Sequence, residues 1–512
     1  MTRRALTLAV PAAWAAAGLS AGPVLAQAPK SALNLAMVAE PPSLDPMAST
    51  ADLVGTIMQH VYETLYTFDG KWGVAPMLAE SMPTVSKDGL RYTIALRKGV
   101  KLHNGRDLDA DDVVASLKRW MDMAPRGKSL ARELDTLSAK GPLMVEIVLK
   151  KPYAPLLPQL ALPSGMAVIM AKESIAQPLT QFVGTGPYRF RERRPDQYVL
   201  LSRFESYSAR KEPANGYAGK REALVEELRF LPVPNANTRV EGSLAGQYHF
   251  ADLLPLEALP RLEKAAGKTV PVMTASFGFP YLVFNTKEGV MASQPMRRAV
   301  QTALGPGQML AAGFGDTRFF TTEAQHFPKG TPFHSDAGTE LYNEANPNKS
   351  RGQAAQAGYK GEAVRILTSR QYEFHHNMAL IMAEQLKRAG FKPELMVVDW
   401  ATLIQRRGDP KLWDIYITHS GQFPEPMLSP PQLGDGAPGW WDSMPKKAAL
   451  AAFNQEPNPA KRGALWSAVQ KVVYEEVPYI NVGKFSSLSA KSPSLDNYQP
   501  ATWPFFWNTK LK

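Results

Sequence analysis

Three short polar and aromatic segments in the C-terminal half of the chain have the residue types of a ligand-binding site. Each follows a predicted strand, and these strands are expected at 363–368, 395–398 and 413–418. The segments are Ser369-Arg370-Gln371-Tyr372, Asp399-Trp400 and His419-Ser420-Gly421-Gln422. Charged, amide and imidazole groups can form hydrogen bonds to a solute, and aromatic rings can pack against one. We therefore predict that these residues bind a small molecule.

The elements between these segments are expected to bring them together. Helices predicted at 373–389 and 402–407 separate the three strands, and Gly390 ends the first helix. Strands that alternate with helices favour a parallel sheet with right-handed connections. Ligands of such sheets gather beyond the carboxyl ends of the strands. The same residues could instead be helix caps and surface loops, and Asp399 in particular is a natural N-cap.

The motifs of known enzyme classes are incomplete or absent. Gly127-Lys128-Ser129 resembles part of a phosphate-binding loop, but Asp122 stands where that loop needs a glycine. Gly313-Phe314-Gly315 lacks the third glycine of a dinucleotide-binding motif, and neither G-x-S-x-G nor H-E-x-x-H occurs. His375-His376 would point about 100 degrees apart on a helix, so solvated or capping roles are expected for them. The sequence predicts no catalysis, no cofactor and no metal site.

Periodicity and capping signals predict several helices elsewhere. Apolar residues on one face predict a helix over 52–66. Asp109 with Asp112 three residues later forms a carboxylate variant of the capping box, which predicts a helix start. Asn458-Pro459 predicts another, with a cap followed by proline at the first helical position.

Composition excludes several classes of protein. A chain of 512 residues is too long for one ordinary core and suggests two or more packed units. A content of 45% hydrophobic and 21% charged residues excludes a disordered chain. Because the chain has 0 Cys, disulfides, thiol catalysis and cysteine-based metal sites are excluded. The net charge of +11 comes from scattered basic residues, so nucleic-acid binding is not expected.

The first 26 residues have the pattern of an export signal. Arg3-Arg4 precede an apolar run over 5–21, and Val24-Leu25-Ala26 offers a cleavage site. Prolines and a glycine in this segment disfavour a membrane-spanning helix. The alternative interpretation is that the segment is an uncleaved membrane anchor. Without cysteine no lipid can be attached at the N-terminus. We expect a soluble periplasmic protein that is not lipid-anchored, exported by either the general or the twin-arginine route.

A series of short motifs follows along the chain. They are Glu40-Pro41-Pro42-Ser43-Leu44-Asp45-Pro46, Tyr62-Glu63-Thr64-Leu65-Tyr66, Leu78-Ala79-Glu80-Ser81, Leu96-Arg97-Lys98-Gly99-Val100-Lys101-Leu102-His103-Asn104-Gly105, Val183-Gly184-Thr185-Gly186-Pro187-Tyr188 and Phe284-Asn285-Thr286. Their types and order resemble the peptide/nickel-type extracellular solute-binding proteins (family 5) of ABC importers. The resemblance extends from about residue 32 to the end of the chain.

This resemblance implies an α/β protein with the two-lobed type II, cluster C-like fold of periplasmic binding proteins. Lobe I would contain residues 32–284 with an extra subdomain at about 66–200, lobe II would contain 285–488, and 489–512 would return to lobe I. The implied function is capture of a small solute between the lobes and its delivery to the permease and ATPase subunits of an ABC importer. A monomer is expected.

The resemblance also implies roles for individual residues. In peptide-binding relatives, the loop after the third strand presents an aspartate to the peptide's amino group. Aligned on Phe423-Pro424-Glu425-Pro426, that position holds Gln422 here. Asp399-Trp400 and Arg407 match an acidic-Trp pair and a downstream Arg of those relatives. The full set of predicted ligand-binding residues is Glu40, Ser43, Arg370, Tyr372, Trp400, Arg407, His419, Ser420, Gly421, Gln422 and Phe423.

Several ligands and functions fit these expectations. Peptides or peptide-like molecules come first, although the missing carboxylate at position 422 weakens the case for ordinary peptides. Opines, oligosaccharides, a chelated metal and haem are alternatives. A periplasmic enzyme on the same fold, or a sensor or chaperone that does not take part in transport, are the other classes considered.

Overall fold

The computed structural model describes residues 31–512 except 50, 266 and 371, and it describes no side chain for Trp400 or Ala401. The predicted export signal, residues 1–26, therefore lies outside the described residues. Within the described part of the chain, no helix has the length and apolar character that crossing a membrane requires.

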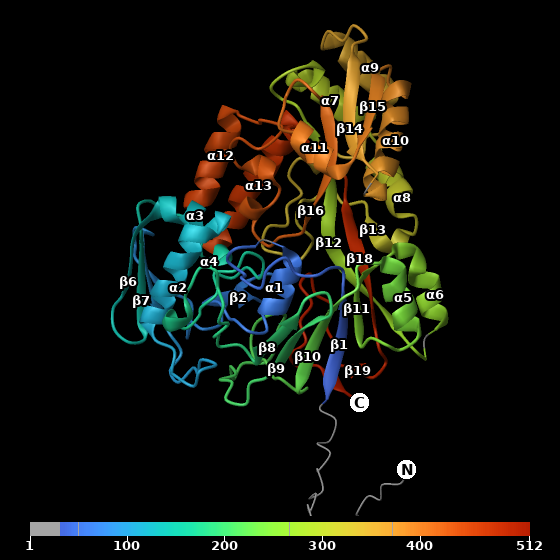
Figure 1. Cartoon of the computed structure of the whole chain (residues 1–512). Coiled ribbons are helices and arrows are strands. Elements are labelled where there is room, and N and C mark those ends of the chain that lie inside the picture. The colour runs from blue at the N-terminus through green and yellow to red at the C-terminus, as the bar shows by residue number, and fades with distance from the viewer. Residues whose placement is uncertain (1–30, 50, 266, 371) are drawn as a thin grey trace, which may run out of the picture.

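A single mixed sheet of 12 strands runs through the length of the molecule (Figure 1). Its main path, in spatial order, is β15 (Lys392–Val398), β14 (Ala363–Ser369), β16 (Ile415–Gly421), β12 (Val270–Phe284), β18 (Lys484–Lys491), β11 (Phe250–Leu254), β1 (Ala32–Met37), β10 (Glu227–Pro232), β9 (Tyr198–Arg203) and β8 (Tyr188–Arg194). Two short strands, β13 (Phe320–Thr321) and β17 (Tyr479–Asn481), pair with β18 and β12.

Strands β12 and β18 connect the two ends of this sheet. The lower part in Figure 1 contains β1 and β8–β11, and the upper part contains β14–β16. β12 pairs with β18 from Val270 to Thr274 and with β16 from Gly278 to Phe284. The register of the β12–β18 pairing shifts between Thr274 and Gly278. The segment of β12 between these two residues is therefore where the strand pairing with β18 becomes irregular, at the passage from the lower part to the upper part.

The upper part contains the predicted β-α-β-α-β unit. Strand β14 pairs in parallel with β15 and with β16, and α10 (Glu373–Arg388) and α11 (Trp400–Arg406) form the crossovers. The prediction ended the third strand at residue 418, but β16 continues to Gly421 because β12 supplies ladder partners as far as Gly278. His419, Ser420 and Gly421 thus lie within the strand and not in the loop after it.

Helices cover both faces of the upper sheet (Figure 1). One face packs on a core that includes side chains of α7 (Gln294–Ala303), α8 (Pro306–Phe314), α9 (Pro347–Gln356) and α10. The other face packs on side chains of α11, α12 (Met444–Gln455) and α13 (Pro459–Glu476). Helix α13 begins as predicted, because the Asn458 side chain accepts a hydrogen bond from the Ala460 N–H and Pro459 is the first helical residue.

The lower part joins the N-terminal half of the chain to its last residues. Its core combines β1 residues with Trp503–Trp507. A second sheet of order β4-β5-β7-β6 packs with α2, and α2 begins with both hydrogen bonds of the Asp109–Asp112 capping box. The bounds here are α1 (Asp52–Met58), β2 (Tyr66–Phe68), β3 (Val74–Pro76), β4 (Thr84–Val85), β5 (Arg91–Ala95), α2 (Ala110–Met123), α3 (Pro125–Glu133), β6 (Leu134–Ala139), β7 (Met144–Leu149), α4 (Leu156–Gln159), α5 (Ala236–Leu244), α6 (Leu259–Lys264), β19 (Leu495–Asp496) and β20 (Lys510–Leu511).

Short 3-10 helices lie between the longer elements. They are η1 (Lys172–Ser174), η2 (Leu256–Ala258), η3 (Val290–Ala292), η4 (Thr317–Phe319), η5 (Thr339–Leu341), η6 (Pro426–Leu428) and η7 (Pro431–Leu433).

The helix predicted over 52–66 is shorter than expected. Its apolar face is buried as predicted, but the helix ends at Met58. The carbonyls of His60 and Val61 accept hydrogen bonds from the N–H groups of Tyr188 and Gly186. Residues 59–61 form a turn that these long-range bonds fix in place, and sequence periodicity cannot reveal such a tertiary contact.

Candidate ligand-binding cleft

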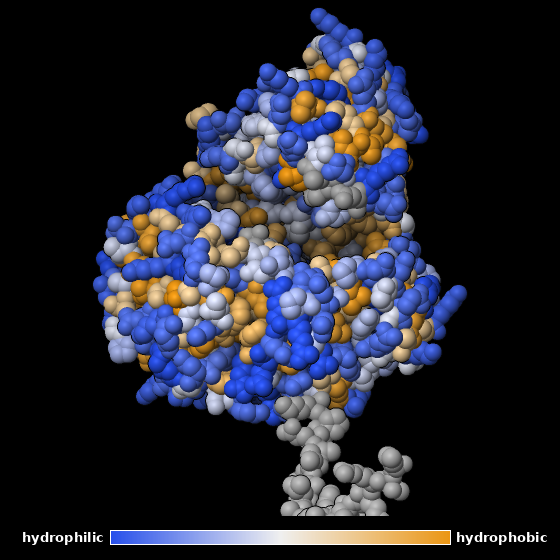
Figure 2. Space-filling view, viewed as in Figure 1, coloured by the Kyte–Doolittle hydropathy of each residue, from blue (hydrophilic) through white to orange (hydrophobic). Residues whose placement is uncertain are grey.

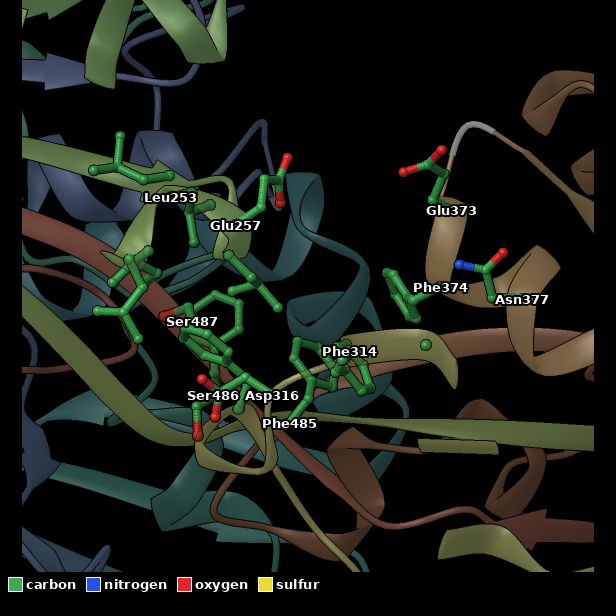
Figure 3. Close-up of a pocket in the computed structure, with 18 of the residues that line it drawn as sticks. Leu253, Glu257, Phe314, Asp316, Glu373, Phe374, Asn377, Phe485, Ser486 and Ser487 are labelled. Carbon is green, nitrogen blue, oxygen red and sulfur yellow. The ribbon is translucent and has the colours of Figure 1, made fainter. Parts of the chain in front are cut away.

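A deep hollow separates the upper and lower parts of the molecule (Figure 2). A cavity of about 590 Å³ opens between α6 of the lower part and α8 and α10 of the upper part. Strands β12 and β18, which run through both parts, also contribute to its wall (Figure 3). Concave sites of this size, lined by two parts of a chain, are typical of small-molecule binding.

Two of the predicted strand ends meet beside this cavity. The ring of Tyr372, before α10, lies 4.8 Å from the ring of His419 on β16. His419 Nδ1 lies 3.0 Å from His375 Nε2, at hydrogen-bond distance. The His419 ring also lies 5.3 Å from Phe374, which lines the cavity. The parallel topology therefore brings together residues from two of the three predicted segments. Arg370, which precedes Tyr372, is exposed.

The expected solvated or capping role of His375 is wrong. His375 is fully buried, because it lies three residues before Met378 on the face of α10 that packs against the sheet. Burial lowers the pKa of His375 well below its usual value and the pKa of His419 to about 4. At neutral pH both rings are uncharged, so a single N–H joins their facing nitrogens.

The sheet divides the other predicted residues between its two faces. Successive side chains of a strand point to opposite faces. On β16, Ile417 packs in the α10-side core and Tyr416 in the α12–α13-side core, so His419 and Ser420 point to opposite faces. Arg407, at the end of α11, acts on the buried Tyr416 phenol, where it opposes the rise in pKa that burial causes. Arg407 and His419 therefore lie on opposite faces of the sheet.

The segment after β16 reaches from the upper part to the lower part. The N–H of Gln422 donates to the Phe277 carbonyl at 3.0 Å, and Gln422 is 4% exposed. Its Oε1 is buried and has no hydrogen-bond partner among the described residues. Phe423 lies 5.9 Å from the Trp503 ring and 5.6 Å from the Arg126 guanidinium carbon.

The remaining predicted residues have local contacts. Glu40 forms an ion pair with Arg193 at 2.5 Å, and the Ser43 hydroxyl accepts a hydrogen bond from the Asp45 N–H. Ser420 Oγ lies 2.5 Å from Ser429 Oγ, and Gly421 pairs with Gly278. Asp399 accepts a hydrogen bond from the Thr402 N–H, as expected of an N-cap. The side chain of Trp400 lies outside what the structure describes.

Sequence reasoning missed a polar cluster on the lower side of the cleft. Trp503 Nε1 donates to Asp52 Oδ1 at 2.7 Å, and Arg126 donates to the Ser164 carbonyl at 2.8 Å. Although solvent reaches Asp52, the surrounding protein raises the pKa of its carboxyl group. Since Asp52 and Trp503 are 451 residues apart, no local pattern could have connected them.

The cavity wall was also missed. Three of its five phenylalanines, Phe314, Phe374 and Phe485, come from α8, α10 and β18, so no single stretch of sequence could have predicted the wall. Among the described residues, no group of three or more His, Asp or Glu side chains is arranged to hold a metal ion.

Comparison with known proteins then identifies the family. The model of the bacterial extracellular solute-binding proteins, family 5 Middle, matches residues 73–439. The chain belongs to this family. The resemblance predicted from the motifs is thus confirmed, and so is the predicted role as a solute-binding protein.

Relatives match over nearly the whole chain. A probable peptide ABC transporter periplasmic-binding protein of Sinorhizobium fredii is 26% identical over 484 residues, covering 91% of this chain and 90% of the relative. The glutathione-binding protein of Escherichia coli K12 is 24% identical over 477 residues, covering 89% of both chains.

Solved structures confirm the predicted α/β type II periplasmic-binding-protein fold. The substrate-binding protein CtaP of Listeria monocytogenes matches with a TM-score of 0.80 and 17% identity, over 94% of this chain and 99% of that chain. A dipeptide-binding protein of Pseudoalteromonas in complex with Met-Leu matches with a TM-score of 0.74 and 21% identity, over 94% and 100%.

Proposed function

We propose that this protein is the periplasmic binding component of an ABC importer, and that it takes up a peptide or a peptide-like molecule. The observation that carries this proposal is the cavity of about 590 Å³ whose walls come from both parts of the molecule. The names of the relatives, one for a peptide transporter and one for glutathione binding, support the choice of ligand. The protein would release its ligand unchanged to a permease, so it needs no catalytic residue.

The proposal includes the lobe limits given by the resemblance. Lobe I consists of residues 32–284 with the return segment 489–512, and it includes the extra subdomain at about 66–200. Lobe II consists of residues 285–488. Two features support this division: Trp503–Trp507 pack into the N-terminal core, and the C-terminal half has its own core around Trp413 and Trp466. Export through a cleaved signal over 1–26, a monomeric state and the absence of a lipid anchor belong to the same proposal.

Closure of the lobes couples binding to delivery. We place the hinge in the segments where β12 and β18 cross between the two parts, at 274–278 and 485–487, so residues 279–284 at the end of lobe I would move with lobe II. Bending there costs conformational free energy, so the ligand must contact both lobes to favour the closed state. The contacts that Phe423 makes with Trp503 and Arg126 show that the loop after β16 already reaches the opposite side.

Thermal stability measures this function directly. A ligand that binds only the folded chain stabilises it by about 2.7 kcal/mol at one hundred times its dissociation constant. We expect di- and tripeptides to raise the melting temperature of the mature chain, in a panel that also contains opines, oligosaccharides, nickel chelates and haem. If only a non-peptide class raises it, the peptide assignment is wrong, and a flat response to the whole panel contradicts solute binding.

A further inference from the structure

The cavity between α6, α8 and α10 has an apolar wall. Most of its lining side chains are leucine or phenylalanine, and they come from both sides of the cleft (Figure 3). Phe314, Phe374 and Phe485 form one continuous aromatic surface, with ring centroids 5.1 Å apart for Phe314 and Phe374 and 5.3 Å apart for Phe314 and Phe485. Such a surface removes the apolar part of a ligand from water.

The charged residues of the same cavity are all acidic. Figure 3 shows Glu257 on one side of the opening and Glu373 on the other. Glu257 lies on η2 of the lower part, and Glu373 lies in the first turn of α10 in the upper part; both residues are exposed. The third acid, Asp316, is occupied by Arg318, which also pairs with Glu263. No described residue of the lining is lysine or arginine.

Neither of these two carboxylates forms an ion pair among the described residues. His376, beside Glu373, has its pKa lowered mainly by burial, so it is uncharged at neutral pH. Arg370 acts on the same His376, but it does not line the cavity. Arg261 on α6 is paired with Glu241, and Glu257 forms no ion pair with a basic residue in the described part of the chain.

Closure would bring the two acidic sides of the opening closer together. Because like charges repel more strongly at shorter distance, Glu257 and Glu373 oppose closure of the empty cleft. A cationic group between them would reverse this effect, since each carboxylate would then gain an opposite charge. An apolar ligand without such a cation would lack this contribution.

We propose that this cavity takes the side chain of a basic residue in a peptide ligand, together with an adjoining apolar side chain. The phenylalanine surface covers the aliphatic or aromatic part, and Glu257 and Glu373 hold the cationic end from opposite lobes. This inference rests on the proposed function, because it names the class of peptide that the cleft selects.

A pair of matched dipeptides tests the selection. Phenylalanyl-lysine and phenylalanyl-norleucine share a four-carbon side chain, but only lysine adds an ammonium group. We expect the mature chain to bind the lysine peptide about tenfold more tightly at low ionic strength, which is the effect of one charge-assisted contact. This preference should weaken as sodium chloride is added, because salt screens partly exposed charges. Equal affinities would overturn the inference.

A double variant assigns the preference to the two carboxylates. In Glu257→Gln/Glu373→Gln the lysine preference should disappear, while affinity for the norleucine peptide stays the same or rises. The control Glu384→Gln/Glu475→Gln removes the same charge at two exposed helical positions outside the cavity lining and should keep the preference. A preference that persists in the first double variant contradicts the inference.

The same titrations separate failure of this inference from failure of the proposed function. Binding of both dipeptides without preference leaves peptide binding intact and rejects only the basic class. Absence of binding to either of them and to the di- and tripeptide panel rejects the proposed function itself. The titrations are repeated with EDTA, and a lysine preference that depends on a divalent metal ion would contradict direct contact between the carboxylates and the ammonium group.

Discussion

Replacement of Arg462 by methionine is expected to lower the free energy of unfolding by about 3–5 kcal/mol. Arg462 forms two hydrogen-bonded contacts with Glu425, at 2.7 and 2.9 Å, and the side chains are 5% and 0% exposed. Without Arg462 the buried Glu425 carboxylate would have no counter-charge and would keep only a long hydrogen bond from the Met427 N–H. The guanidinium also packs over Phe453 and Phe333, at 4.1 and 5.2 Å from their ring centroids.

The double variant Arg462→Met/Glu425→Gln is the control for this expectation. It removes both charges, so most of the lost stability should return, because a buried ion pair can often be exchanged for neutral groups at little cost. Urea unfolding followed by tryptophan fluorescence gives both values. A single variant as stable as the unmodified chain, or a double variant no better than the single one, would show that the pair is not buried as described.

Replacement of Gln422 by aspartate is expected to change both stability and ligand affinity. Gln422 is 4% exposed and its Oε1 has no partner among the described residues, so a carboxylate there would lack a counter-charge in the empty protein. The ligand-free chain should therefore lose stability. A peptide with a free amino group would supply the missing positive charge, and its affinity should rise roughly tenfold to a hundredfold.

Two controls isolate the role of charge at this position. Gln422→Asn shortens the side chain without adding a charge and should not improve binding. The N-acetylated form of the same peptide has no ammonium group and should gain nothing from Gln422→Asp. Calorimetric titration of the three proteins with both peptides decides the matter. Unchanged or weaker binding of the free-amine peptide to Gln422→Asp would show that residue 422 does not face the ligand's amino group.

Local sequence signals predicted the framework of the upper part well. Alternation of strands with helices, together with Gly390 after α10, was sufficient for the parallel unit. These signals come from residues close together in sequence, whose burial follows directly from periodicity. The capping signals at Asp109 and Asn458 were reliable for the same reason.

Features that depend on distant segments were not predictable. The extra residues of β16 need β12 as a partner, and the early end of α1 needs the segment at 186–188. The site residues Arg407 and His419 were expected together, but strand alternation places them on opposite faces of the sheet. The Asp52–Trp503 contact joins residues 451 positions apart, and the aromatic cavity wall joins three separate segments of the chain. Contacts between distant segments cannot be predicted from the periodicity of any one local stretch of sequence.

Lobe closure can be measured directly in this protein because it contains 0 Cys residues. Lys264→Cys on α6 and Leu380→Cys on α10 introduce two exposed labelling sites on opposite sides of the cleft. Pulsed electron spin resonance on the doubly spin-labelled chain reports the distance between them, with and without a saturating pool of di- and tripeptides. The account predicts a shorter and narrower distance distribution when peptides are present. A distribution that stays unchanged, while the same pool raises the melting temperature, would contradict capture by closure of the two lobes.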